Sequence, residues 1–259
     1  TFLEISGKQL GNMNIKVPST LEQTKIGDYF QKLDTLIEQK EKRYQKLEQF
    51  KKAMLSKMFP KNGAATPDIR FKGFSGKWEE KKLGECVLIQ RGGSPRPIEK
   101  FITQNENGIN WIKIGDVSTD SRYITKTKEK IIPEGEKYSR KVFIGDLILS
   151  NSMSFGRPYI MAIEGCIHDG WLLIRDEQKM FNIEYLLQLL SSDYMIDQYK
   201  SLASGGVVIN LNSELVQSTN VYIPTIAEQT KIGNFFQKLD TLIELQLQEI
   251  EKLKHLKKA

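Results

Sequence analysis

Cysteine and histidine are scarce in this 259-residue sequence, which contains two of each. Cys86 and Cys166 are too few for a disulfide framework, and together with two histidines they form no zinc-binding pattern. The simplest interpretation is a protein of a reducing, cytoplasmic environment.

Long apolar runs are also lacking. No stretch of about 18 apolar residues is present, so the sequence predicts no transmembrane helix and no membrane partner. The first residues lack the apolar segment of a signal peptide, and Thr1 is not an initiator methionine.

The motifs of the common nucleic-acid enzymes are missing as well. There is no GxxxxGK[ST] phosphate loop, no Asn-Pro-Pro-aromatic tetrad with a glycine-containing cofactor loop, and no acidic cluster with a lysine typical of metal nucleases. The sequence therefore predicts no catalysis by this chain, no cofactor on it and no metal site.

Charge of one sign is in moderate excess. Thirty-eight Lys and Arg against 32 Asp and Glu give a net charge of +6. This excess suits a nucleic-acid partner, because basic side chains displace counterions from phosphates. Many soluble proteins are mildly basic, however, so charge alone decides little.

An internal repeat organises the chain. Residues 17–38 read VPSTLEQTKIGDYFQKLDTLIE and residues 223–244 read IPTIAEQTKIGNFFQKLDTLIE, an ungapped match at an offset of 206. Each copy opens with capping-box spacing, Ser19 to Glu22 and Thr225 to Glu228, which predicts helices that begin near residues 20 and 226.

Both predicted helices carry apolar residues at alternating steps of three and four, close to a heptad pattern. A helix of about 40 residues is about 60 Å long, too long to pack along one domain of this size. We expect the two helices to form an antiparallel pair, or to pair with another chain; the alternative is that each is a surface helix of the globular domain. Gly27 and Gly233 lie inside the helices, and their recurrence predicts close approach of another backbone, with the first turns docked on the globular domain.

The middle of the chain has a different pattern. Short apolar runs predict strands, with one helical stretch at 182–202 and a turn followed by a strand at 204–211; the strand segments are 86–89, 110–114, 146–150, 159–163 and 170–174. Strands interleaved with few helices indicate an α+β domain. Residues 1–18 look like a shortened copy of the segment that leads into the second helix.

Several segments in this order resemble specificity subunits of type I restriction-modification systems. They are PDIRFKGFSGKWEEKKLGE (67–85), INWIKIGDV (109–117), GDLILSNSMSFGRPYIM (145–161), the Ser-Gly-Gly at 204–206 and the duplicated helix. The resemblance implies a sequence-specific, non-catalytic DNA-binding subunit with a mixed α/β target-recognition domain and two long helices that form an antiparallel, coiled-coil-like spacer.

Partners and cofactors follow from the same resemblance. It implies binding to double-stranded DNA, to a methyltransferase (modification) subunit and to a restriction/translocase subunit, with S-adenosylmethionine, ATP and Mg belonging to those partners. Members of the family typically carry two recognition domains, whereas this chain has two spacer helices and one full domain. A homodimer that reads a palindromic split site is the expectation that follows.

These considerations divide the chain into five predicted parts. They are a remnant of an upstream recognition-domain tail (1–18), the first spacer helix (19–59), a linker (60–68), the target-recognition domain (69–222) and the second spacer helix (223–259).

Two loops are the first candidates for DNA contact. Glycines allow close approach, and arginines can bind guanine edges or phosphates, which favours the loop from Arg91 to Arg96. The second loop follows a predicted buried strand and carries amide, hydroxyl and guanidinium groups. The candidate residues of the two loops are Arg91, Gly92, Gly93, Ser94, Arg96, Asn151, Ser152, Ser154 and Arg157. Ordinary surface turns are the alternative for both loops.

Three further candidates complete the predicted site. His168 and Asp169 suggest acid-base chemistry, but with no nucleophile motif nearby His168 is assigned a structural or DNA-contacting role. Gly205 and Gly206 could approach the DNA backbone, or end a helix. The competing function is a coiled-coil scaffold whose middle domain binds a protein or a small ligand.

Overall fold

The computed structural model describes residues 5–61, 63–117, 121–151, 156–203 and 211–258. The chain divides into two compact units, one of residues 1–46 with 245–259 and one of residues 47–244. Both long helices contribute to both units, so each unit is described by itself. The five predicted parts of the chain remain a prediction.

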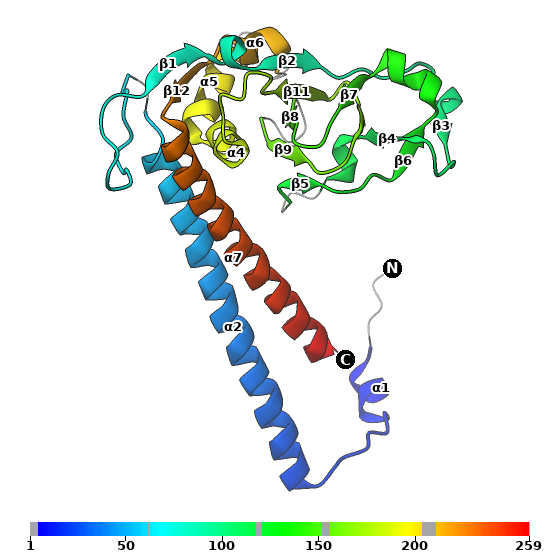
Figure 1. Cartoon of the computed structure of the whole chain (residues 1–259). Helices are drawn as coiled ribbons and strands as arrows, with labels where there is room; N and C mark the ends of the chain where they lie inside the picture. Colours follow the sequence, from blue (N-terminus) through cyan, green and yellow to red (C-terminus); the bar gives the residue numbers. More distant parts are fainter. Residues whose placement is uncertain (1–4, 62, 118–120, 152–155, 204–210, 259) are drawn as a thin grey trace. The chain divides into compact units, whose positions relative to one another are not determined.

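The two repeat helices begin where the sequence predicts. Helix α2 spans Thr20–Lys57 and helix α7 spans Ile226–Lys258 (Figure 1). The hydroxyl of Ser19 accepts a hydrogen bond from the backbone N–H of Glu22, and that of Thr225 accepts one from the backbone N–H of Glu228, both at 3.4 Å. The predicted reciprocal contact of Glu228 is replaced by an ion pair, because Arg70 donates to both of its carboxylate oxygens, at 2.6 and 2.8 Å.

The helices pack against each other in antiparallel fashion. In the first unit Lys40 pairs with Glu249 and Lys254 with Glu41, each at 2.6 Å, and Lys257 pairs with Asp34. Among these residues, Asp34 is nearest the start of α2 and Lys257 is nearest the end of α7, so their pairing shows that the two helices run in opposite directions. The buried positions of this seam are Leu33, Ile37, Gln246 and Ile250. The predicted antiparallel spacer is confirmed.

The domain in the second unit contains two five-stranded mixed sheets. One has the order β2-β11-β8-β9-β5, with the strands Leu88–Arg91, Trp171–Arg175, Leu147–Ser150, Pro158–Met161 and Tyr123–Ile124. The other has the order β3-β6-β4-β10-β7, with the strands Ile102–Thr103, Glu129–Ile131, Ile109–Ile112, Gly165–Ile167 and Arg140–Val142. A two-stranded ribbon pairs β1 (Glu79–Lys82) with β12 (Asn220–Ile223). The predicted α+β class is confirmed.

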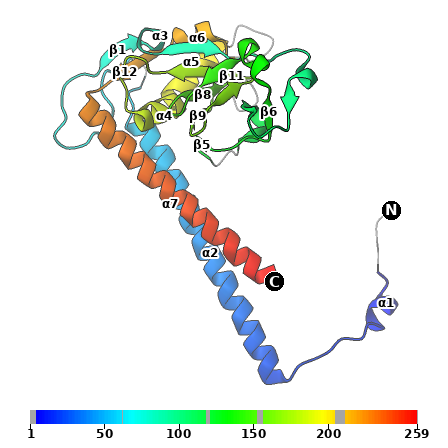
Figure 2. The same cartoon turned by 45° about the vertical axis from the view of Figure 1, so that its right-hand side comes forward.

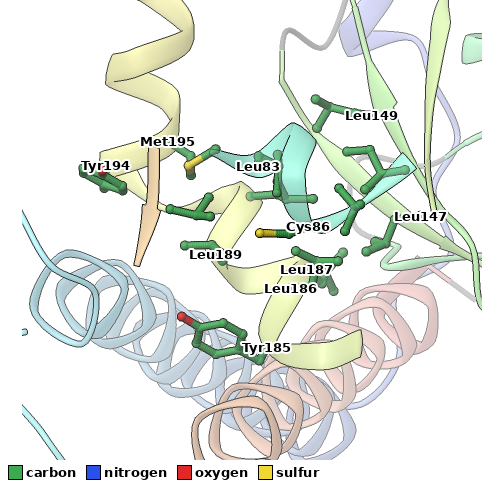
Figure 3. Close-up of a cluster of buried hydrophobic side chains, with 14 of the residues drawn as sticks. Leu83, Cys86, Leu147, Leu149, Tyr185, Leu186, Leu187, Leu189, Tyr194 and Met195 are labelled. Atoms are coloured by element: carbon green, nitrogen blue, oxygen red, sulfur yellow. The ribbon is translucent and has the colours of Figure 1, made fainter. Parts of the chain in front are cut away.

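Alternation along β8 builds the core. Leu147 and Leu149 face helix α4 (Figure 3). Ile148 packs on the other side, toward the second sheet, with Ile112 and Val142. Successive strand residues point to opposite faces, so a strand with both faces covered is apolar throughout. This explains why β8 is buried at all four positions.

The helical stretch predicted at 182–202 forms two helices. Helix α4 spans Ile183–Ser191 and helix α5 spans Asp193–Ala203. The break lies at Ser192, whose hydroxyl is bonded to the carbonyl of Leu189 at 2.6 Å and competes with helical hydrogen bonding. One other prediction was wrong: Cys86 ends the short helix α3 (Leu83–Cys86) and the strand begins only at Leu88, because Val87 N–H continues the helical turn to Leu83. The predicted strand at 207–211 lies almost wholly outside the described residues.

The remaining helices are short. They are α1 (Gly7–Gly11), α6 (Ser213–Gln217) and the 3-10 turns Ile98–Lys100, Ile114–Asp116 and Pro133–Tyr138 (Figure 2). Helices α1 and α6 are separated by the same offset of 206 residues as the long repeat. Ser6 and Asn212 are their N-caps. The structural repeat therefore extends upstream of the obvious sequence match, to residue 6.

The two repeat glycines have different surroundings. A Cβ at Gly233 would lie 2.6 Å from Asn182 Oδ1 and 2.9 Å from the backbone nitrogen of Tyr185, so α7 docks closely on the start of α4. A Cβ at Gly27 would meet nothing within 4 Å. The predicted close approach is confirmed for the second copy, and was wrong for the first within this chain.

Candidate nucleic-acid interface

Three loops meet where neighbouring strands of the first sheet end or begin. Strand β11 pairs antiparallel with β2 on one side and with β8 on the other, matching Leu172 to Arg91 and Trp171 to Ser150. Antiparallel pairing puts the ends of β2 and β8 beside the start of β11. The loop after Arg91, the residue after Ser150 and the turn before Trp171 are therefore brought together by the sheet itself.

Asp169 joins these loops through its backbone. Its carbonyl oxygen accepts a hydrogen bond from Arg91 Nε at 3.2 Å and another from Asn151 Nδ2 at 2.9 Å. Two predicted contact residues from different loops thus have one common acceptor.

The carboxylate of Asp169 makes a second set of contacts. One oxygen accepts from Ser94 Oγ at 3.1 Å and lies 3.0 Å from His168 Nε2, and the other accepts from Arg96 Nη2 at 3.4 Å. The Arg96 side chain is 81% exposed and that of Asp169 is 29% exposed. The cluster consequently presents a guanidinium and a carboxylate side by side at the surface.

The ring of His168 has a polar neighbour at each of its two nitrogens. Nδ1 accepts from the backbone N–H of Gly170 at 2.9 Å, and Nε2 lies 3.0 Å from a carboxylate oxygen of Asp169. The ring also packs edge-on against the buried Trp111. His168 is thus oriented on both sides, which fits the predicted structural or contacting role.

The glycines of the first loop serve close approach to protein backbone. A Cβ at Gly92 would lie 2.2 Å from the carbonyl oxygen of His168, and one at Gly93 would lie 2.7 Å from that of Tyr138. Their N–H groups are also engaged, with Trp171 at 2.8 Å and Ile167 at 3.1 Å. These glycines position the loop, and direct DNA contact by them remains a prediction.

A cavity of about 740 Å³ adjoins the cluster. Ser94, Arg96, His168 and Asp169 line its polar part, and its apolar wall consists of Pro95, Pro97, Ile98, Ile102 and Trp111. Lys113 and Glu129, paired at 2.5 Å, also line it. The cluster thus borders a hollow large enough for a planar group the size of a base.

The remaining predicted residues are placed otherwise. Arg157 is half-buried and its guanidinium lies over the ring of Tyr159, 5.6 Å from the ring centre. Ser152, Ser154, Gly205 and Gly206 lie outside the described residues. The structure therefore brings Arg91, Gly92, Gly93, Ser94, Arg96, Asn151 and His168 together around Asp169, which the sequence analysis names beside His168 but does not include among the candidate contact residues. An acidic residue next to a histidine, two residues before the apolar strand that begins at Trp171, was the available signal.

Two general features of the described residues bear on chemistry. No helix in the described ranges is long and apolar enough to cross a membrane. Within the same ranges, no group of three or more His, Cys, Asp or Glu side chains is arranged to hold a metal ion.

The fold defines a class of protein: a mixed α/β domain inserted between two long helices that pack against each other. The model of the family described as "Type I restriction modification DNA specificity domain" matches residues 75–255. The chain belongs to this family.

Individual relatives agree with the assignment. The chain is 25% identical over 268 residues to the type I restriction enzyme MjaVIII specificity subunit of Methanocaldococcus jannaschii, a match that covers 98% of this chain and 61% of that protein. The putative MjaX specificity subunit of the same organism is 24% identical, with 98% and 59% covered. The crystal structure of the HsdS subunit from Thermoanaerobacter tengcongensis superposes with a TM-score of 0.65 at 17% identity, covering 99% of this chain and 61% of that one. The chain thus spans about 60% of the length of these relatives.

Proposed function

We propose that this chain is the DNA-specificity subunit, or half of one, of a type I restriction-modification complex and that it directs partner subunits to a split DNA site. The observation that carries the proposal is the convergence of Arg91, Arg96, Asn151 and His168 on Asp169 at one sheet edge. The family and the curated relatives, whose names describe specificity subunits, support it.

The chemistry of the cluster suits base reading. Arginine can contact guanine O6 and N7 with two donors, and an asparagine amide can contact adenine N6 and N7. Side chains that read bases must be held in place, and here the loops are held by two strand pairings and by shared acceptors. Arg91 and Arg96 stay exposed while Asn151 is buried, so we assign Asn151 to support of the loops and the two arginines to contact with DNA.

A second copy of this chain is the proposed protein partner, together with a methyltransferase subunit and a restriction/translocase subunit. Its support is a difference between the repeats: apolar residues of the first copy are exposed, whereas their counterparts in the second are buried or half-buried. The exposed residues are Leu10, Ile15, Val17, Ile26, Tyr29 and Phe30, and the counterparts are Val216, Val221, Ile223, Ile232, Phe235 and Phe236. An exposed apolar face of this kind marks a protein interface. It also supports residues 1–18 as the tail of a further recognition domain.

The chemistry of methylation and cleavage is assigned to the partners. S-adenosylmethionine, ATP and Mg belong to those subunits in this proposal, and this chain contributes no catalytic group. The proposed location is the cytoplasm, where the DNA is and where Cys86 and Cys166 remain reduced.

The decisive experiment maps methylation. The chain is assembled with the methyltransferase subunit of its own system and S-adenosylmethionine, and methylated adenines in a random DNA library are located by single-molecule sequencing. Two identical inverted half-sites support a symmetric pair of these chains, and an asymmetric split site indicates that another recognition domain has been supplied. If a methyltransferase subunit that is verified as active yields no methylation motif above background, the proposal is contradicted.

The scaffold alternative retains some support from the long helices. It predicts that replacement of Arg91 and Arg96 by alanine changes no DNA binding, since there is none to change. The proposal predicts loss of affinity. A loss confined to certain sequences marks base contacts, and a loss equal on all sequences marks phosphate contacts.

A further inference from the structure

Asp169 contacts the neighbouring loops through both its backbone and its side chain. The backbone carbonyl accepts from Arg91 and Asn151, and the carboxylate contacts Ser94, Arg96 and His168. The backbone N–H of Asp169 also donates to Ser94 Oγ, at 3.4 Å. A substitution at position 169 therefore changes the carboxylate contacts and leaves an acceptor for Arg91 and Asn151.

We propose that Arg96 and Asp169 together read one G·C base pair, with Arg96 on guanine and Asp169 on cytosine. This inference rests on the proposed function and deepens it, because it names the base pair and the residues that select it.

The donors and acceptors at the surface match that base pair. In the major groove guanine presents two acceptors, O6 and N7, and cytosine presents the N4 amino donor. A guanidinium has five N–H donors. Nη2 of Arg96 donates to a carboxylate oxygen of Asp169 at 3.4 Å, which leaves other N–H groups of Arg96 for a base. The adjacent carboxylate can accept from a donor, so the two side chains carry the complement of a G·C edge.

The carboxylate also works against non-specific binding. Asp169 is 29% exposed beside an 81% exposed arginine, so a phosphate that approached Arg96 would meet a negative charge. Contact with an amino group has no such penalty. The pair therefore favours a base edge over the DNA backbone at this position.

The test compares two variants with a charge-matched control. Asp169→Asn removes the charge but keeps the shape, and Arg96→Lys keeps the charge but removes the two-donor fork. Asp68→Asn removes one negative charge from an exposed pair with Lys61 and is the control. The wild-type and variant chains, each assembled with the methyltransferase subunit, select from a random-sequence duplex pool, and affinity is then measured on selected and on random duplexes over a range of salt.

The expected result is specific. The wild-type motif contains a G·C pair at which both variants lose about tenfold or more in discrimination. Asp169→Asn accepts adenine in the place of the cytosine, since an amide pairs with adenine N6 and N7. It binds random duplexes as well as the wild type or better, with a steeper salt dependence because Arg96 is freed for phosphate. Asp68→Asn keeps the wild-type motif.

Three results overturn the inference. If Asp169→Asn selects the wild-type motif with unchanged discrimination, the carboxylate reads no base. If Asp169→Asn loses affinity equally on all duplexes, with or without a lower melting temperature, the role of Asp169 is structural alone. If the wild-type complex selects no motif at all, the proposed function fails as well, and that outcome is distinguishable because it needs no variant.

Discussion

The repeat glycines allow the same substitution to be made twice in equivalent sequence. Replacing glycine by alanine inside a helix stabilises by about 1 kcal/mol when the new methyl group meets nothing. Gly27 has open space, so Gly27→Ala should raise the free energy of unfolding by about that amount. Gly233 follows the same five residues, Glu-Gln-Thr-Lys-Ile, so a large difference between the two variants is expected to come from packing.

At Gly233 the new methyl group collides with the start of α4. The Cβ would lie 2.6 Å from Asn182 Oδ1, the oxygen that caps α4 by accepting from Tyr185 N–H at 3.1 Å. Losing a cap costs about 1 kcal/mol, and overpacking costs about 1–3 kcal/mol. After the helix gain is subtracted, Gly233→Ala should destabilise by roughly 1–3 kcal/mol.

Urea denaturation of the two variants and the wild type, followed by circular dichroism, measures this difference. The expected gap between the variants is roughly 2–4 kcal/mol, with opposite signs. Equal effects within about 0.5 kcal/mol would refute the reasoning, because packing would then not distinguish the two copies. If a second copy covers the first repeat, Gly27→Ala should also weaken self-association, which light scattering would show.

Three further predictions follow from individual contacts. Glu228→Gln should destabilise by about 3–5 kcal/mol in urea denaturation, because it leaves the half-buried Arg70 without its charged partner, whereas Glu79→Gln at an exposed pair should change stability by less than about 1 kcal/mol. Both cysteines are fully buried, so reaction with a thiol reagent should follow unfolding, and fast labelling of the native protein would contradict the core as described. Burial raises the pKa of Cys166 to about 11 from an ordinary value of 9.0, so the unfolded chain loses this proton first; stability should fall as pH rises from about 9 to 11, and a Cys166→Ala variant should show a shallower fall.

The long helices were predictable because their signals are local. Capping residues fix their starts, and the heptad-like pattern fixes the buried face, as the burial of Leu33 and Ile37 shows. The break at Ser192 was not predictable from periodicity, since the apolar pattern runs through it and the hydroxyl contact depends on the folded turn. The orientation of the helices became certain only from ion pairs between residues far apart in the sequence.

The candidate site was predictable in its parts but not in its centre. Arginine, serine and asparagine in glycine-containing loops are local signals, so Arg91, Arg96 and Asn151 could be singled out. Asp169 joins them only because β11 lies between β2 and β8, and strand order is not encoded in any one loop. Close approach at Gly92 and Gly93 was predicted correctly, but what these glycines approach is the backbone of the same chain.

The use of a main-chain carbonyl as the common acceptor at position 169 bears on how such a domain can diversify. Every amino acid supplies that carbonyl, so a replacement at 169 keeps an acceptor for Arg91 and Asn151. Under the proposed base-reading role, the side chain at 169 can vary together with the residues at 94 and 96, and a new target preference can arise while both loops keep this acceptor.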